Sequence, residues 1–86
     1  MIVFEEFSKL GFNQCEVVQG HIIYKKCAPT VGDYIVVKFF PNKSYVVLYE
    51  KHFLDEYGND EFYEWIYGIN EELNNAIQKQ LKELWQ

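Results

Sequence analysis

The chain has 86 residues, and its thirteen acidic and eight basic side chains give a formal net charge of −5. A chain this short builds one hydrophobic core, so we expect a single domain over residues 1–86, and 49% hydrophobic with 24% charged residues is typical of a soluble globular protein. The negative charge and the absence of arginine argue against direct nucleic-acid binding, which depends on cations that neutralise phosphates.

The sequence also indicates a cellular compartment. No apolar run reaches the roughly 18–20 residues of a membrane span. The first residues, MIVFEE, lack the basic start of a secretory signal. We therefore expect a cytoplasmic protein that contacts no membrane. The two cysteines, Cys15 and Cys27, are too few for a disulfide scaffold, and we expect both to be buried thiols acting as small hydrophobic side chains.

The N-terminal residues 2–10 predict a short helix. Val3, Phe7 and Leu10 recur at helical spacing, and Gly11 follows where a left-handed cap often ends a helix. Phe12 would then fold back onto Phe7. A helix of this length is unstable alone, so packing must hold it.

Two β-hairpins are expected next. Residues 15–18 and 21–26 predict the first, with a two-residue turn at 19–20 that places Cys15 opposite Tyr24.

Residues 34–40 and 44–50 predict the second hairpin around a turn at 41–43, because both segments are rich in β-branched and aromatic residues. Neither face of this hairpin is cleanly polar. The sheet therefore needs cover on both faces, or leaves one face free for a partner.

The last third of the chain predicts a loop, a strand and a helix. Residues 52–60 resemble a loop with its tip at 58–59, and alternating hydrophobicity over 61–67 predicts a fifth strand, with an irregular segment or a helical turn as alternatives. Residues 70–85 predict the clearest helix, with Asn70 as N-cap and an apolar stripe at helical spacing. The expected class is α+β: a short N-terminal helix, an antiparallel sheet of four or five strands, and a long C-terminal helix packed across one sheet face.

The sequence predicts no catalytic site. The two histidines, His21 and His52, share no triad or metal-ligand spacing with the cysteines, and every glycine stands alone at a turn or cap rather than in a phosphate-binding loop. The acids around residues 55–60 are out of register with a calcium loop. We therefore expect a protein that is not an enzyme and that uses no cofactor and no metal.

The most informative pattern is the concentration of acids between residues 50 and 72. This stretch holds eight acids and one lysine, a charge of −7, which leaves +2 for the rest of the chain. Aromatic residues are interspersed with the acids, which suits a surface that docks on a basic protein, because aromatics anchor and charges steer. A spaced row of carboxylates can also imitate nucleic-acid phosphates. The predicted partner-binding residues are Glu50, Asp55, Glu56, Tyr57, Asp60, Glu61, Tyr63, Glu64 and Trp65.

Two other interpretations remain open at this point. In the first, several of these aromatics belong to the core and the acids are only a solvated rim. In the second, the protein is a structural homo-oligomer in which the uncovered apolar sheet face pairs with its own copy as a homodimer or larger assembly.

Three segments resemble small proteins encoded by phages and prophages of Gram-positive bacteria. They are FEEFSKLGF at residues 4–12, IIYKK at 22–26 and INEELNNAIQKQLKEL at 69–84, of which the last is the most specific. The resemblance spans most of the chain, but this type of family carries no settled biochemical role. It implies a genomic context, in which small acidic phage proteins include inhibitors of CRISPR effectors and other host-defence machinery. It therefore implies an acidic, anti-CRISPR-like inhibitor that binds a host or phage protein in the host cytoplasm.

Overall fold

The computed structural model describes residues 2–85. Its elements are α1 (Phe4–Ser8), β1 (Gln14–Val18), β2 (His21–Cys27), β3 (Tyr34–Phe39), β4 (Tyr45–Leu54), β5 (Asp60–Ile66) and α2 (Glu71–Leu84). The five strands form one antiparallel sheet in the order β1-β2-β3-β4-β5, so that each strand pairs with its neighbour in the chain. This arrangement confirms the predicted α+β class and the fifth strand.

The first hairpin has the predicted register. Val18 lies opposite His21 and Cys15 lies opposite Tyr24. Gln19 and Gly20 have φ values of 50° and 82°, the pair of positive angles that a type I′ hairpin turn requires. The predicted burial of the cysteines is wrong, because Cys15 lies on an exposed edge strand and Cys27 at the exposed end of β2.

The N-terminal helix is shorter than the predicted 2–10, since α1 has five residues. Its predicted cap is present. Gly11 has a φ of 94°, the amide of Phe12 donates to the carbonyl of Phe7 (3.1 Å), and the two rings meet edge to face with centroids 5.6 Å apart.

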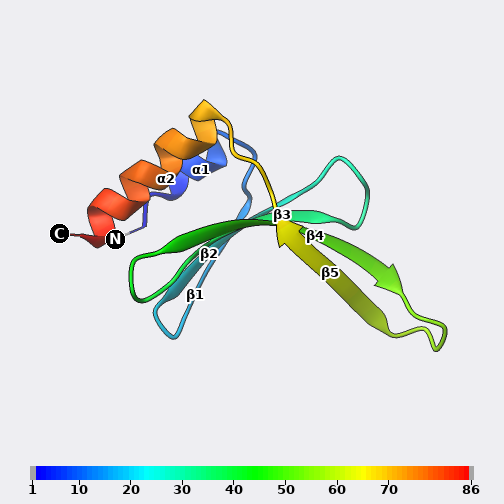
Figure 1. The fold of residues 1–86 in the computed structure, drawn as a ribbon. Helices are drawn as coiled ribbons and strands as arrows, with labels where there is room; N and C mark the ends of the chain where they lie inside the picture. The colour runs from blue at the N-terminus through cyan, green and yellow to red at the C-terminus, as the bar shows by residue number, and fades with distance from the viewer. Residues whose placement is uncertain (1, 86) are drawn as a thin grey trace.

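The C-terminal helix α2 begins as predicted. The Asn70 side chain accepts a hydrogen bond from the Leu73 amide at 2.8 Å, which satisfies one of the free amides of the first turn. One stripe of the helix, including Leu73, Ala76 and Ile77, is buried. Both helices lie on the same side of the sheet (Figure 1).

The core lies between the helices and the adjacent ends of β2, β3 and β4. The ring of Phe7 stacks on Tyr24 with centroids 3.9 Å apart, and Phe39 meets both rings edge on at 6.2 Å. Its buried members are Phe7, Phe12, Ile22, Tyr24, Ala28, Ile35, Val37, Phe39, Val47, Leu73, Ala76 and Ile77. The strand members of this core alternate along their strands, so they all come from one sheet face.

The opposite sheet face carries no helix, and we call it the open face. It presents the residues that alternate with the core positions, among them Ile23, Val36 and Leu48. Val36 is only 2% exposed, because its neighbours on this face surround it, whereas Ile66 at the end of the same cross-strand row is 73% exposed. Of the two predicted alternatives, the structure has the second: the helices cover one face of the sheet and leave the other face without a helix.

A two-stranded arm extends past the helices. Pairing between β3 and β4 ends at Glu50, whereas pairing between β4 and β5 continues to Leu54 and Asp60. The predicted loop over 52–60 is therefore wrong at both ends, and only residues 55–59 form the turn. Figure 1 shows this hairpin pointing away from α1 and α2, and the molecule measures 47 × 26 × 19 Å along its principal axes. We call residues 50–66 the arm.

Candidate protein-binding site

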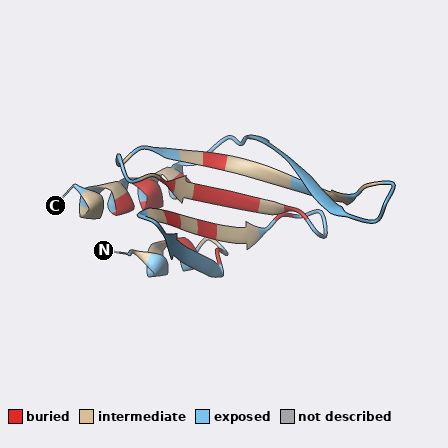
Figure 2. Ribbon diagram, turned by 90° about the horizontal axis from the view of Figure 1, so that it is seen from below, coloured by how far each residue is buried: buried red, intermediate tan, exposed pale blue. Residues whose placement is uncertain are grey.

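The arm carries every residue that the sequence predicts for partner binding. β5 is exposed along its whole length, and Figure 2 draws it pale blue, as it does the other edge strand, β1. Tyr57, Tyr63 and Trp65 are 81%, 65% and 47% exposed. Within residues 2–85, the buried core cluster contains no side chain from the arm. The interpretation that these three aromatics belong to the core is therefore wrong.

The strand register divides the predicted residues between the two faces of the arm. Tyr49 packs against the core, and Trp65 lies opposite it, so the residues in phase with Trp65 share the helix-side face. The remaining strand residues point to the open face. Glu61, Tyr63 and Trp65 belong to the helix-side face, Glu50, Asp60 and Glu64 belong to the open face, and Asp55, Glu56 and Tyr57 lie in the turn.

The helix-side face of the arm is a row of stacked aromatic pairs. Tyr49 stacks on Trp65 and Phe53 stacks on Tyr63, each with ring centroids 4.9 Å apart and planes within 19° of parallel. Tyr67 approaches Tyr49 at 5.8 Å. Such cross-strand pairs stabilise a two-stranded ribbon that has no third strand to support it. The exposed parts of these rings also provide an apolar surface beyond the end of the helices.

The acids of the open face are partly neutralised within the chain. Glu50 Oε1 lies 3.5 Å from Lys25 Nζ and 3.2 Å from His52 Nε2, and its side chain is only 15% exposed. His52 Nδ1 lies 3.7 Å from Asp60 Oδ1, although the Asp60 side chain remains 71% exposed. Glu64 stands directly across the ladder from Glu50. Glu50 is therefore engaged by Lys25 and by the His52 ring, whereas Asp60 and Glu64 stay available to a partner.

Asp55 has an internal role in the turn of the arm. Its Oδ1 accepts from the amides of Tyr57 and Asn59, both at 2.8 Å, and its Oδ2 accepts from the Asn59 side chain at 3.4 Å. These bonds, that of the Asn59 amide foremost, lower the pKa of the Asp55 carboxyl from its ordinary value. An Asp with Gly-Asn beginning three residues later is typical of a side-chain-stabilised turn. The sequence predicted a loop here, but it assigned Asp55 itself only to the acidic surface. Of the six predicted acids, Glu56, Asp60, Glu61 and Glu64 are left to face a partner.

Four residues of the arm were not among the predicted partner-binding residues. Phe62 is 52% exposed and Leu54 is 70% exposed on the open face of the arm, and His52 stacks on Phe62 with centroids 5.3 Å apart. His52, Phe53 and Leu54 had no predicted face, because residues 52–60 were assigned to a loop. The sequence signal for these three residues is that they continue a β-rich segment without a break.

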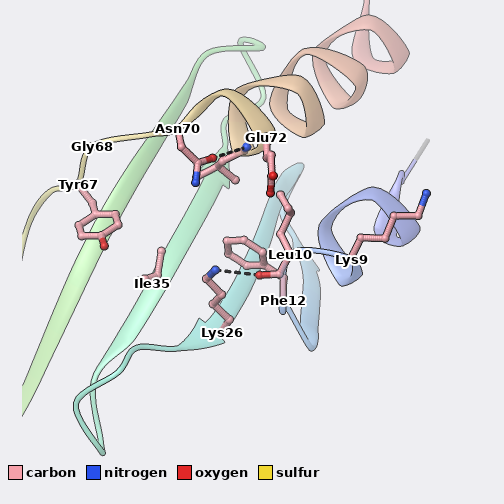
Figure 3. A pocket seen from close by; sticks show the side chains of 10 residues that line it. Lys9, Leu10, Phe12, Lys26, Ile35, Tyr67, Gly68, Asn70 and Glu72 are labelled. Carbon is pink, nitrogen blue, oxygen red and sulfur yellow. Dashed lines mark hydrogen bonds between the residues drawn. The ribbon is translucent and has the colours of Figure 1, made fainter.

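A separate cavity of about 360 Å³ lies between α1, the sheet and the start of α2 (Figure 3). Lys26 Nζ lines it, but donates to the Leu10 carbonyl at 2.8 Å and lies 4.8 Å from the Phe12 ring centroid. This lysine therefore fixes the end of α1 to the sheet rather than serving a ligand. Neither His21 nor His52 lines the cavity.

Two other kinds of feature, a metal site and a membrane-spanning helix, are absent from residues 2–85. No three His, Cys, Asp or Glu side chains come close enough together to hold a metal ion. No helix in this range is both long and apolar enough to cross a lipid bilayer. Comparisons of the chain with protein-family models, with curated proteins and with solved structures found no match.

Proposed function

We propose that this protein is a non-enzymatic binding module that docks its arm on a basic protein surface. The observation that carries the proposal is that the arm projects past the helices with every residue of β5 exposed, bearing Asp60, Glu61 and Glu64 beside Tyr63 and Trp65. An interface of this composition gains affinity from the aromatic side chains and gains association rate and selectivity from the charges.

The proposed partner is a nucleic-acid-handling or defence enzyme of a bacterial host. The basic groove of such an enzyme is complementary to a narrow acidic ribbon, because the carboxylates occupy positions that phosphates would otherwise take. The phage or prophage origin, the anti-CRISPR-like activity and the host cytoplasm as its location rest on the resemblance of residues 4–12, 22–26 and 69–84.

Charge reversal in the arm tests this function. The variant Glu61→Lys/Glu64→Lys is compared with the control Glu5→Lys/Glu16→Lys, which has the same net charge but changes exposed acids of α1 and β1. We expect the unmodified protein and the control to capture the same proteins from a Gram-positive host lysate at low salt and to lose them at high salt. The arm variant should capture none of them at either salt concentration. Capture that ignores both salt and arm reversal would contradict the proposal.

A second candidate, a homodimer through the open face, is favoured by the charge pattern around its apolar centre. Val36, Leu48 and Ile66 form a row across three strands, with Lys38 toward one end of the strands and Glu64 toward the other. If a second copy is related by a two-fold axis parallel to this row, the two open faces meet, and Lys38 of each copy lies toward the strand end of the other copy that carries Glu64. Light scattering at high micromolar concentration separates the candidates, because a strict monomer excludes this one.

A further inference from the structure

The outer edge of β5 has backbone groups that no other strand within residues 2–85 covers. β5 is the last strand of the sheet, and all seven of its residues are exposed. The Tyr67 amide donates to the Val47 carbonyl at 2.9 Å, which sets the alternation of the antiparallel ladder. Residues in phase with Tyr67, among them Trp65 and Tyr63, direct their backbone groups to β4. The amides and carbonyls of Phe62 and Glu64 therefore point outward.

This edge lacks the features that usually block strand addition. Exposed edges are commonly protected by lysine, proline, a bulge or a very short strand. β5 contains neither lysine nor proline, and it pairs with β4 without interruption from Asp60 to Ile66. β1, the other edge strand, has only five residues. The protection that β5 does have is negative charge.

Charge decides which strand can pair with this edge. A second copy would bring Asp60, Glu61 and Glu64 of two β5 strands together, and like charges on adjacent strands repel. An extended segment rich in lysine or arginine would meet the same acids with attraction. The acids thus oppose self-pairing and select a basic partner.

We propose that β5 receives an extended basic segment of a partner protein as a sixth strand, with backbone hydrogen bonds to Phe62 and Glu64. This inference rests on the proposed function and deepens it by naming the mode of docking. On the open face, Asp60 and Glu64 are four residues apart, about 13 Å at the usual strand rise. The partner segment therefore carries cations at two positions four residues apart, with an apolar residue between them that contacts Phe62.

Amide hydrogen exchange with a defined probe tests the proposal. The probe is the synthetic peptide Thr-Lys-Thr-Val-Thr-Lys-Thr, whose two lysines and central valine share one face of an extended strand. Its control is the same peptide with N-methylated lysines and valine, which keeps the charge but loses the backbone donors that an antiparallel strand would direct to Phe62 and Glu64. We expect the probe to slow exchange at Phe62 and Glu64 by at least about tenfold, while the amides of Tyr63 and Trp65, already bonded to β4, change little. The control should slow neither. Absence of probe binding at low salt, or binding without protection of Phe62 and Glu64, would overturn the proposal.

A pair of variants at one position isolates the backbone contribution. Glu64→Gln removes the charge, and Glu64→Pro removes the charge and the outward amide without breaking a bond to β4. We expect Glu64→Pro to bind the probe up to about tenfold more weakly than Glu64→Gln, the factor for one backbone hydrogen bond. Circular dichroism and thermal melting check that both variants fold. If Glu64→Pro does not fold, the hydrogen-exchange experiment on the unmodified protein decides the proposal.

The two proposals fail in distinguishable ways. If Glu64→Pro binds as tightly as Glu64→Gln while Glu61→Lys/Glu64→Lys loses its partner, strand addition is excluded and the acidic docking function stands. If arm reversal leaves partner capture unchanged, the docking function itself fails.

Discussion

Gln80 joins both helices to the sheet through one buried amide oxygen. The residue is fully buried, and its Oε1 accepts from the Tyr24 hydroxyl at 2.6 Å and from the Val3 amide at 3.1 Å. Burial raises the pKa of the Tyr24 hydroxyl well above its ordinary value, so this group stays a neutral donor at physiological pH. The sequence shows only a polar residue in a mostly apolar helix stripe, and its partner Tyr24 is 56 residues away.

Replacing Gln80 by leucine should destabilise the protein by about 1–3 kcal/mol, because the buried Tyr24 hydroxyl loses its acceptor. Urea denaturation measures the change in the free energy of unfolding. Adding Tyr24→Phe to Gln80→Leu should recover part of the loss, since both polar partners are then absent. The control Gln78→Leu, at an exposed position of the same helix, should change stability by no more than about 0.5 kcal/mol. Equal effects at positions 78 and 80 would contradict the assigned role of Gln80.

Asp33 lies directly before the first residue of β3, at the point where β4 continues past β3 into the arm. Its Oδ2 accepts from the Tyr49 hydroxyl at 2.7 Å and its Oδ1 accepts from the His52 amide at 3.1 Å. The bond from Tyr49 is the main cause that lowers the pKa of the Asp33 carboxyl, with the His52 amide adding to it. The His52 amide points to the side where β3 would lie if that strand were longer. The Asp33 carboxylate accepts its hydrogen bond in place of a backbone carbonyl of β3.

A lowered pKa in the folded state means that this carboxylate stabilises the protein above its ordinary pKa of about 4, and that the gain disappears as the pH falls through the lowered value. We expect Asp33→Asn to be less stable than the unmodified protein at pH 7 and the difference to shrink as the pH is lowered from about 5 toward 2. Denaturation curves across this range measure it. Tyr49→Phe should reproduce part of the effect, and a difference that grows in acid would exclude this account.

At the scale of elements, the arm is a ribbon with little support outside itself. Its outer part has only two strands, and such ribbons are marginally stable unless cross-strand pairs hold them. Phe53 and Tyr63 form such a pair near the turn. Since the arm contributes nothing to the buried core cluster within residues 2–85, its opening is expected to be local.

Breaking the Phe53–Tyr63 pair should loosen the arm without unfolding the protein. We expect Phe53→Ala or Tyr63→Ala to weaken the arm by about 0.5–1.5 kcal/mol, seen as faster amide exchange within residues 51–63. The double variant should cost less than the sum of the two single variants, because each alone already removes the contact. Global melting should shift little, and a large shift would contradict the independence of the arm.

Removing the acids of β5 should convert its edge into a self-pairing one. We expect Asp60→Asn/Glu61→Gln/Glu64→Gln to form dimers or larger species at concentrations where the unmodified protein is monomeric, because the repulsion between neighbouring β5 strands is lost. Light scattering as a function of concentration measures this. The matched control, Glu5→Gln/Glu16→Gln/Glu71→Gln, removes three exposed acids elsewhere and should not change the association state.

The sequence predicted the elements whose pattern arises from burial or from turn chemistry. The turn at Gln19 and Gly20, the Asn70 cap and the buried stripe of α2 all have local signals, and all are confirmed. The extension of β4 through residues 51–54 could not be predicted, because both faces of the arm meet solvent and no alternation of burial marks the strand.

The candidate site was predictable in composition but not in arrangement. The exposure of Tyr57, Tyr63 and Trp65 follows from their acidic surroundings, whereas their distribution over two faces depends on the register with β4. The internal engagement of Glu50 by Lys25 depends on β2 and β4 flanking β3, a contact between distant parts of the chain that no local pattern encodes.

As a whole, the molecule has a helix-covered end that holds the core and an opposite end that consists of the arm alone (Figures 1 and 2). The two ends meet where Lys51 lies opposite Tyr63. This is a hydrogen-bonded pair of the antiparallel ladder, because such pairs recur every second residue from the Val47–Tyr67 pair. A two-residue turn can close a hairpin at such a pair. The arm beyond it is therefore removable without disturbing the core.

Replacing residues 52–62 by Asn-Gly should leave a folded protein that no longer binds its partner. We expect the free energy of unfolding to change by no more than about 1 kcal/mol, since the deleted residues lie outside the core cluster. Thermal melting and the lysate capture described above measure the two properties. An unfolded product, or a folded one that keeps its partner, would show that function and stability are not divided between the two ends.

The exposure of the two cysteines has a practical consequence. Cys15 shares the helix-side phase with Tyr24, whereas Cys27 lies opposite Tyr34 on the other phase, so the two thiols sit on different faces of one thin sheet. Partial burial raises the pKa of the Cys15 thiol, which lowers its thiolate fraction and slows its reaction with a maleimide. A dye on each single-cysteine variant would report on the sheet face that its cysteine occupies. The variant whose dye fluorescence changes when a partner protein binds would identify the face that the partner covers.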